Sequence, residues 1–276
     1  MSAASIRPMT PGDIEPAGAA ILADDWGDRR TWFEYAVAAP TVHPYVAETT
    51  DGVVGTAVAA IHGPVAWIGT IWVQRAARRL GLGAALTAAA MDAAEAAGCA
   101  TQVLVATEAG RPLYERLGFE VQTWYRTMER RGVAGPGPAR VRPFHPADLP
   151  AMVALDRLAT GEDRRAPIET FAAPTTTRVA TDGEAVAGFV VRAPWGGGAT
   201  VARSLDDALA ILEARLAAAG PDRTVRCGIT LDNAAGAEAL EARGWSEAWR
   251  APRLVLGEAP RWDPAMLWGQ FNHAMG

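Results

Sequence analysis

The stretch from Arg78 to Gly83, RRLGLG, places two arginines and two glycines between a strand-like run and a helix-like run. The start of a helix has unpaired N–H groups and a partial positive charge, so it attracts anions. Glycines lack a Cβ and let a phosphate approach the backbone, while arginines add charge-assisted donors. The stretch is therefore a candidate phosphate site. A plain strand-to-helix turn with solvated arginines is the alternative.

The spacing of these residues separates the stretch from other phosphate-binding loops. Its pattern is R-x-x-G-x-G, at Arg78, Gly81 and Gly83, and it follows a strand in the middle of the unit. It does not have the GxxxxGK[ST] form of a nucleotide-hydrolase loop, nor is it a GxGxxG after a first strand. Downstream, RPLYERLGF (Arg111 to Phe119) places a tyrosine four residues before a Gly-Phe pair.

Together the two motifs resemble the GCN5-related N-acetyltransferase (GNAT) family over Ser5 to about Arg130. The resemblance implies that Tyr114 is the general acid that protonates the departing thiolate of coenzyme A. It implies that main-chain groups of the preceding strand pair with the pantetheine arm, at Ile71, Trp72 and Val73. Thr107 stands where some members have an asparagine that touches this arm. The resemblance also implies that backbone N–H groups of the loop bind the pyrophosphate of acetyl-CoA, at Arg78, Arg79, Leu80, Gly81, Leu82, Gly83 and Ala84.

The general base is left open by the sequence. Some members of the family use a glutamate on the strand before the loop, but Trp67 stands at that position here. Other acidic and histidine side chains are candidates, although each taken alone is more typical of a solvated or structural residue. These candidates are Glu34, His43, Glu48, His62 and Glu108.

The segment ADDWGDRRTWFEY, from Ala23 to Tyr35, mixes carboxylates with aromatic side chains. Such a mixture suits a cationic amine through ion pairing and cation–π contact. We therefore take Asp24, Asp25, Trp26 and Glu34 as candidate acceptor residues. An amphipathic helix pair with a buried aromatic face is the alternative, and amino acid derivatives, polyamines, aminoglycoside-like drugs and peptide N-termini all remain open as acceptors.

The chain repeats itself once. SIRPMTPGDIEPA from Ser5 corresponds to RVRPFHPADLPAM from Arg140, and two further echoes follow in the same order. A Gly- and Pro-rich segment joins the copies, which predicts domains at 1–132 and 140–276 with a linker at 133–139. We expect a mixed α/β fold of tandem acyl-CoA N-acyltransferase-like domains. The elements expected in the first copy are strands at 5–7, 45–48, 52–62, 65–73, 101–106 and 119–126, and helices at 14–23, 30–39, 83–97 and 109–117.

The second copy lacks the residues that carry the chemistry of the first. Its corresponding helix begins at an N-cap serine, Ser204, and Asp206 and Asp207 place negative charge where a pyrophosphate needs donors. Leu240 replaces the tyrosine. We therefore predict a degenerate GNAT-like domain that does not catalyse and that is structural or helps to wall the acceptor pocket.

Composition narrows the function further. The 276 residues carry a net charge of -5, which argues against nonspecific nucleic-acid binding. Cys99 and Cys227 form no metal-binding motif, and no long apolar run or signal peptide is evident, so we expect no metal, no membrane and a cytoplasmic location. The sequence predicts an acetyl-CoA-dependent N-acetyltransferase acting on a small-molecule amine. A non-catalytic acyl-CoA-binding regulator and an acyltransferase for longer acyl-CoA are the alternatives.

Overall fold

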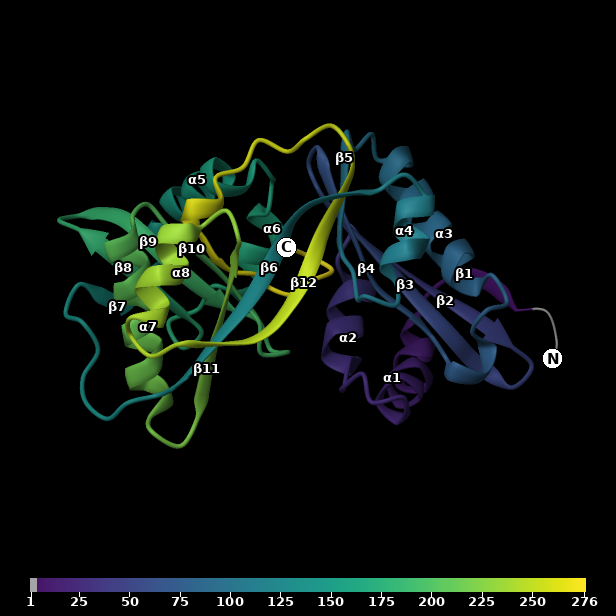
Figure 1. Ribbon diagram of the computed structural model, residues 1–276, viewed down its shortest axis with the longest axis horizontal. Coiled ribbons are helices and arrows are strands. Elements are labelled where there is room, and N and C mark those ends of the chain that lie inside the picture. Colours follow the sequence, from purple (N-terminus) through teal and green to yellow (C-terminus); the bar gives the residue numbers. More distant parts are fainter. Residues whose placement is uncertain (1–3) are drawn as a thin grey trace.

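The computed structural model describes residues 4–276, and the order of its elements repeats once (Figure 1). Each copy runs β-α-α-β-β-β-α-β-α-β, as the sequence echoes predict. The first copy contains β1 (Ser5–Pro8), α1 (Ile14–Ala23), α2 (Arg30–Ala38), β2 (Val42–Thr49), β3 (Gly52–His62), β4 (Val65–Val73), α3 (Leu82–Ala96), β5 (Thr101–Val105), α4 (Arg111–Arg116) and β6 (Glu120–Arg131). These bounds agree with the expected elements to within a few residues, except that β2 starts earlier and β6 ends later.

The second copy follows the same plan and adds one strand at its end. It contains β7 (Val141–Pro143), α5 (Leu149–Thr160), α6 (Arg165–Phe171), β8 (Thr177–Asp182), β9 (Ala185–Arg192), β10 (Gly198–Ala202), α7 (Leu205–Ala219), β11 (Thr224–Thr230), α8 (Ala234–Glu241), β12 (Ser246–Gly257) and β13 (Leu267–Gly269). The segment predicted as a linker lies against α7, where the Val133 N–H donates to the carbonyl of Leu216 at 3.1 Å. The domain bounds themselves stay a prediction.

The repeated Arg-Pro…Asp motif forms the same ion pair in each copy. Arg7 contacts Asp13 at 2.7 Å, and Arg142 contacts Asp148 at 2.7 Å. Each aspartate also accepts a backbone N–H three residues earlier, from Thr10 or from His145. The arginine and these hydrogen bonds hold the pKa of both carboxyls below the usual range. The motif therefore fixes where the first strand of each copy turns into its first helix.

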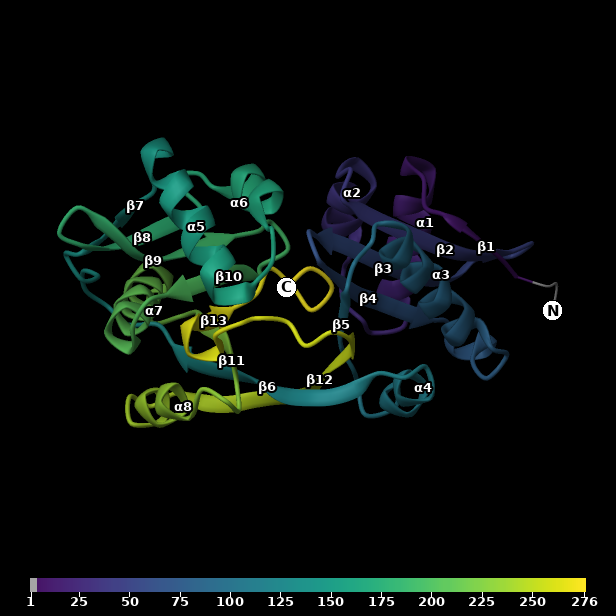
Figure 2. The same ribbon diagram turned by 90° about the horizontal axis from the view of Figure 1, so that it is seen from above.

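The two copies exchange their last strands. The larger sheet has the order β1-β2-β3-β4-β5-β12-β6-β11, and the smaller one β13-β10-β9-β8-β7. Strand β12 of the second copy pairs with β5 of the first, while β6 of the first pairs with β11 of the second. The strands β6 and β12 run side by side from one half to the other (Figure 2). Because the larger sheet contains strands of both copies, the halves form one continuous structure.

Helices cover both faces of the first copy's part of this sheet. Ile21 of α1 and Trp32 of α2 belong to the apolar cluster on one face, and Leu86 of α3 and Tyr114 of α4 belong to the cluster on the other. The first of these clusters continues into the second copy through Phe171 of α6. The aromatic residues on this face therefore pack between the halves.

Candidate active site

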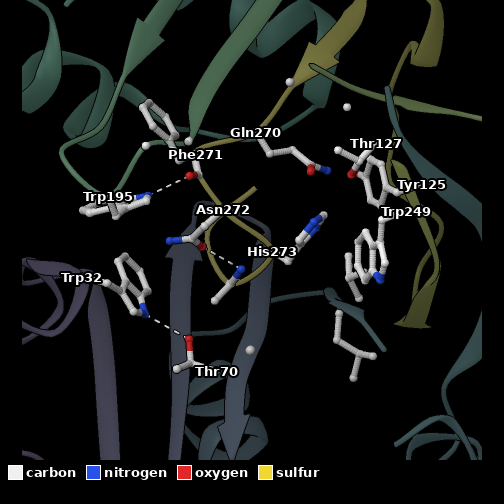
Figure 3. Close-up of a pocket in the computed structure, with 18 of the residues that line it drawn as sticks. Trp32, Thr70, Tyr125, Thr127, Trp195, Trp249, Gln270, Phe271, Asn272 and His273 are labelled. Carbon is white, nitrogen blue, oxygen red and sulfur yellow. Dashed lines mark hydrogen bonds between the residues drawn. The ribbon is translucent and has the colours of Figure 1, made fainter. Parts of the chain in front are cut away.

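Strands β4 and β5 are paired for only part of their length. They run parallel and are hydrogen-bonded from Val65 to Trp67 and from Thr101 to Val103, after which the pairing stops. A cavity of about 550 Å³ begins at this opening and is lined on one side by Ile68–Ile71 of β4 and by Leu104–Thr107. On its other side it reaches β11 and the segment Gly269–Ala274, so both halves of the molecule contribute to its wall (Figure 3).

A bulge in β4 lies at the edge of this cavity. Thr70 has a φ of +51°, and the register against β3 shifts by one residue between Gly69 and Trp72. Two hydrogen bonds fix the bulge: Thr56 Oγ1 donates to the Thr70 carbonyl at 2.8 Å, and Trp32 Nε1 donates to Thr70 Oγ1 at 3.0 Å (Figure 3). Beyond Trp67, no strand of residues 4–276 pairs with β4 on the side that faces β5, although the Val73 carbonyl accepts a hydrogen bond from Arg78 Nε. This is the geometry that an added ligand strand requires.

The loop between β4 and α3 has the conformation that its glycines predict. Arg79 and Gly81 have φ values of +66° and +83°, and α3 begins at Leu82 without a side-chain cap. Within residues 4–276, no backbone N–H from Arg79 to Ala84 donates to a protein acceptor, and the first bond of the helix runs from Ala85 N to the Gly81 carbonyl. Unpaired N–H groups at a helix start have a geometry that suits an anion. The N–H of Arg78 differs, because it donates to Arg75.

The side chain of Arg78 connects this loop to α1. Its Nε donates to the Val73 carbonyl at 2.9 Å, and its Nη2 contacts Asp24 at 3.0 Å. The same carboxylate accepts a hydrogen bond from Trp72 Nε1 at 3.0 Å. Asp24 therefore stabilises the loop, and the exposed Arg79 is left as the arginine that can reach an anion from outside.

Tyr114 lines the cavity next to the end of β5. Its side chain is 8% exposed, and burial raises the pKa of its hydroxyl to about 12. The phenol is therefore protonated at neutral pH, as a proton donor must be. Thr107, which also lines the cavity, accepts the Gly110 N–H on Oγ1 at 3.1 Å and thereby fixes the turn that leads into α4.

The predicted acceptor residues do not all lie at the cavity. Trp26 lines the cavity, Asp24 is held by Arg75 and Arg78, and Asp25 and Glu34 are not among the described lining residues. The candidate bases Glu34, His43, Glu48, His62 and Glu108 are also outside the described lining. His62 is buried, its Nε2 lies 2.9 Å from the Met275 carbonyl, and burial lowers its pKa to about 3.

The segment after β13 supplies residues that the sequence did not single out. His273 lies between two aromatic rings of the exchanged strands, with ring centroids 5.8 Å from Tyr125 and 5.2 Å from Trp249 (Figure 3). Burial, with a smaller contribution from Arg29, lowers its pKa to about 4, so the imidazole is neutral at pH 7. No spacing in the sequence connects this tail to β4, and only the tertiary fold brings Ala274 against Gly69.

In the second copy the corresponding opening is filled by the chain itself. Strand β13 pairs with β10 at Thr200–Gly269 and Val201–Leu267 and also contacts β11. Trp268 is buried there and packs beside Gly236 of α8. Within residues 4–276, no three His, Cys, Asp or Glu side chains are grouped so that they could hold a metal ion. No helix in the described chain has the length and apolarity to cross a membrane.

Known proteins share this architecture. The GNAT acetyltransferase family model matches residues 13–119. A putative acetyltransferase from Pyrococcus horikoshii is 22% identical with a TM-score of 0.85, covering 100% of this chain and 97% of its own. A GCN5-related N-acetyltransferase from Sphaerobacter thermophilus is 17% identical with a TM-score of 0.64, covering 95% and 98%. A tandem GNAT protein from the clavulanic acid biosynthesis pathway is 16% identical with a TM-score of 0.60, covering 93% and 99%. These structures share the fold, and a comparison with curated proteins found no match.

Proposed function

We propose that this protein, whose residues 13–119 match the GNAT acetyltransferase family model, is an acetyl-CoA-dependent N-acetyltransferase that acts on a primary amine of a small molecule. One observation carries the proposal. The opening between β4 and β5 lies where β4 continues into the loop of free N–H groups, and Tyr114 lines the cavity at that opening. A pyrophosphate site, a strand edge and a proton donor are thus arranged along one path.

The residues along this path fit acetyl-CoA. The N–H groups from Arg79 to Ala84 would hold the pyrophosphate, with the exposed Arg79 side chain as a further donor. The main chain of Ile71–Val73 would pair with the amides of the pantetheine arm. Thr107 would contact the same arm from the opposite side of the opening.

Bound acetyl-CoA supplies an acetyl group on a thioester, and the amine nitrogen forms the new C–N bond as the C–S bond breaks. Tyr114 gives its hydroxyl proton to the departing sulfur. The nitrogen loses a proton to the neutral imidazole of His273, which lines the same cavity and makes no hydrogen bond to residues 4–276. This proton then returns to the Tyr114 oxygen through solvent. One proton thus moves from nitrogen to sulfur in each turnover.

A thiol-release assay with acetyl-CoA and a panel of amines tests this proposal. We expect turnover by the wild-type protein and thermal stabilisation by coenzyme A. Tyr114→Phe should lower kcat by on the order of 10²-fold, the lower end of what general acids contribute, and leave coenzyme A binding unchanged. Tyr45→Phe is the matched control, because Tyr45 lies on β2 outside the described cavity lining.

The same assay separates the alternatives. Binding of coenzyme A without thiol release from any amine would indicate an acyl-CoA-binding regulator. Faster turnover with longer acyl-CoA donors would indicate a different acyltransferase. If coenzyme A does not bind at all, the proposed function is wrong.

A further inference from the structure

The charged side chains that line the cavity are all basic. They are Arg29, Arg215 and Arg226, and no Asp or Glu of residues 4–276 belongs to the lining. A cavity of this kind disfavours an acceptor that carries several positive charges, because no anion there offsets them. The carboxylates that suggested a cationic acceptor from the sequence point elsewhere, since Asp24 is bound by arginines of the β4–α3 loop.

Arg29, at the N-terminal end of α2, forms no salt bridge with any residue of 4–276, although the neighbouring Asp28 offsets part of its charge. Asp28 precedes it in the chain, but that carboxylate contacts Arg30 at 2.9 Å. Among residues 4–276, Arg29 takes part in no ion pair and donates no side-chain hydrogen bond, although it is half-buried. Burial lowers the pKa of its guanidinium from the usual value. A charged group that is partly desolvated and unpaired is costly unless a ligand pairs with it.

The other two arginines differ in how far they are already paired. Arg226 contacts Glu129 at 2.9 Å and is largely exposed, so its charge is offset. Arg215, on α7, donates from Nη2 to the Arg226 carbonyl at 2.8 Å, while its Nε is buried without a partner among the described residues. The second half of the molecule therefore adds a further desolvated cation to the cavity.

The wall beside Arg29 is aromatic. Trp32 and Trp195 come from different halves and meet edge to face at 5.1 Å, and Phe171 packs against Trp195 at the same centroid distance. Trp195 Nε1 donates to the Phe271 carbonyl at 2.7 Å, which attaches the tail to this wall (Figure 3). An apolar surface next to an unpaired guanidinium suits a ligand with an apolar body and an anionic group.

We propose that the acceptor is an amine that also carries a carboxylate and an apolar side chain, as an α-amino acid does, and that Arg29 binds the carboxylate. This inference rests on the proposed function and names the substrate class of the same site. A bound carboxylate offsets the charge of Arg29. It thereby removes a repulsion that opposes protonation of His273, so the correct acceptor makes the imidazole a better proton acceptor.

Matched pairs of amines test the inference. L-phenylalanine is compared with phenethylamine, L-tryptophan with tryptamine and L-leucine with isoamylamine, each at saturating acetyl-CoA, and spermidine serves as a polycation. We expect kcat/KM to favour the acid of the preferred pair by roughly 10- to 100-fold, as one charge-assisted contact supports. Arg29→Gln should abolish the preference by slowing the acid alone. Arg165→Gln is the matched control, because Arg165 contacts Glu169 on α6 and is not among the described lining residues.

A binding measurement separates the inference from the proposed function. Calorimetry compares N-acetyl-L-phenylalanine with N-phenethylacetamide, and we expect the acid to bind more tightly in the wild type and equally in Arg29→Gln. If both amines of every pair are acetylated equally, the function stands and the inference is wrong. If the acid binds through Arg29 but acetyl-CoA is never used, the carboxylate contact of Arg29 stands and the proposed function is wrong. If Arg215→Gln abolishes the preference and Arg29→Gln does not, the assignment to Arg29 is wrong.

Discussion

The two copies differ most where the fourth strand of each unit passes into a long helix. In the first copy the loop before α3 contains two residues with positive φ and a run of unpaired N–H groups. In the second copy Ser204 caps α7, with its Oγ accepting the Asp207 N–H at 3.2 Å and donating to the Asp207 carboxylate at 2.6 Å. One helix start is open to an external anion, and the other is satisfied by its own side chains.

The opening between strands next to this helix start also differs between the two copies. Between β4 and β5 the backbone edge is free, whereas β13 pairs with β10 in the second copy and brings Trp268 against α8. Arg140 pairs with the Asp207 carboxylate and donates to the Asp206 carbonyl, which holds the charge of Asp207 beside the capped helix. The second copy thus has contacts within the chain where the proposed ligand contacts of the first copy would lie. A domain can keep its fold by this route after its ligand site is gone.

The variant expected to have the largest effect on this difference between the copies is Gly81→Glu. A side chain at φ +83° costs about 1–2 kcal/mol, and a carboxylate at this helix start repels a pyrophosphate. No atom lies within 4 Å of the added Cβ, so the fold itself should survive. We expect the affinity for coenzyme A to fall by more than roughly 100-fold in calorimetry.

The matched change in the second copy is Ser204→Gly, which removes the cap of α7. We expect coenzyme A binding to remain at the wild-type value, because the ligand site belongs to the first copy. Loss of binding in this variant, or retained binding in Gly81→Glu, would mean that the cofactor occupies a different part of the molecule.

A second test concerns the proton donor, since Leu240 occupies the position of Tyr114 in the second copy. Leu240 is fully buried and Tyr114 nearly so, so both positions tolerate a large side chain in the core. In Tyr114→Phe we expect kcat to fall by on the order of 10²-fold at unchanged KM for acetyl-CoA. An unchanged kcat would remove the main chemical difference between the copies.

The local sequence predicted most of the fold of the first copy. Its strands and helices are marked by β-branched runs, by glycine stops and by the Ala-rich α3, whose end has Gly98 at φ +73° as expected for a C-terminal glycine. The strand exchange could not be predicted, because β6 and β12 have the same pattern and either can pair with β5 or β11. Register between equivalent strands is decided by tertiary packing.

The candidate site was predictable only where its residues are close together in sequence. The β4–α3 loop and Tyr114 belong to motifs that are visible in the sequence, and their roles stay predictions. Trp195, His273 and the unpaired Arg29 come from three distant segments that meet at the cavity. The acidic residues before α2 predicted contacts to a cationic acceptor. Asp24 instead accepts hydrogen bonds from Arg78 and Trp72, so its charge is offset by the loop.

A third test asks whether β13 stabilises the second copy, where it pairs with β10 and fills the opening between strands. Trp268 is 1% exposed and donates from Nε1 to the Ala265 carbonyl at 3.0 Å. Trp268→Ala should lower the free energy of unfolding by about 3–5 kcal/mol, the range for buried aromatic truncations. Trp249→Ala, at a tryptophan that is 43% exposed, should cost much less in the same urea titration. Equal losses of unfolding free energy in the two variants would mean that β13 contributes little to stability.

The smallest expected effect concerns acid stability of the tail that follows β13. His62 holds the Met275 carbonyl at 2.9 Å, and burial lowers the pKa of His62 to about 3. In the unfolded chain a histidine has a pKa near 6.5, so below this pH the unfolded state binds a proton that the folded state excludes. Stability should therefore fall as the pH drops from about 6.5 toward 4, by about 1 kcal/mol between pH 7.5 and 5.5 from His62 alone.

Urea titrations at these two pH values should show a smaller difference for His62→Gln than for the wild type or for His43→Gln, at a half-buried histidine on β2. An identical difference in His62→Gln and wild type would show that this imidazole does not link the tail of the second copy to the sheet of the first.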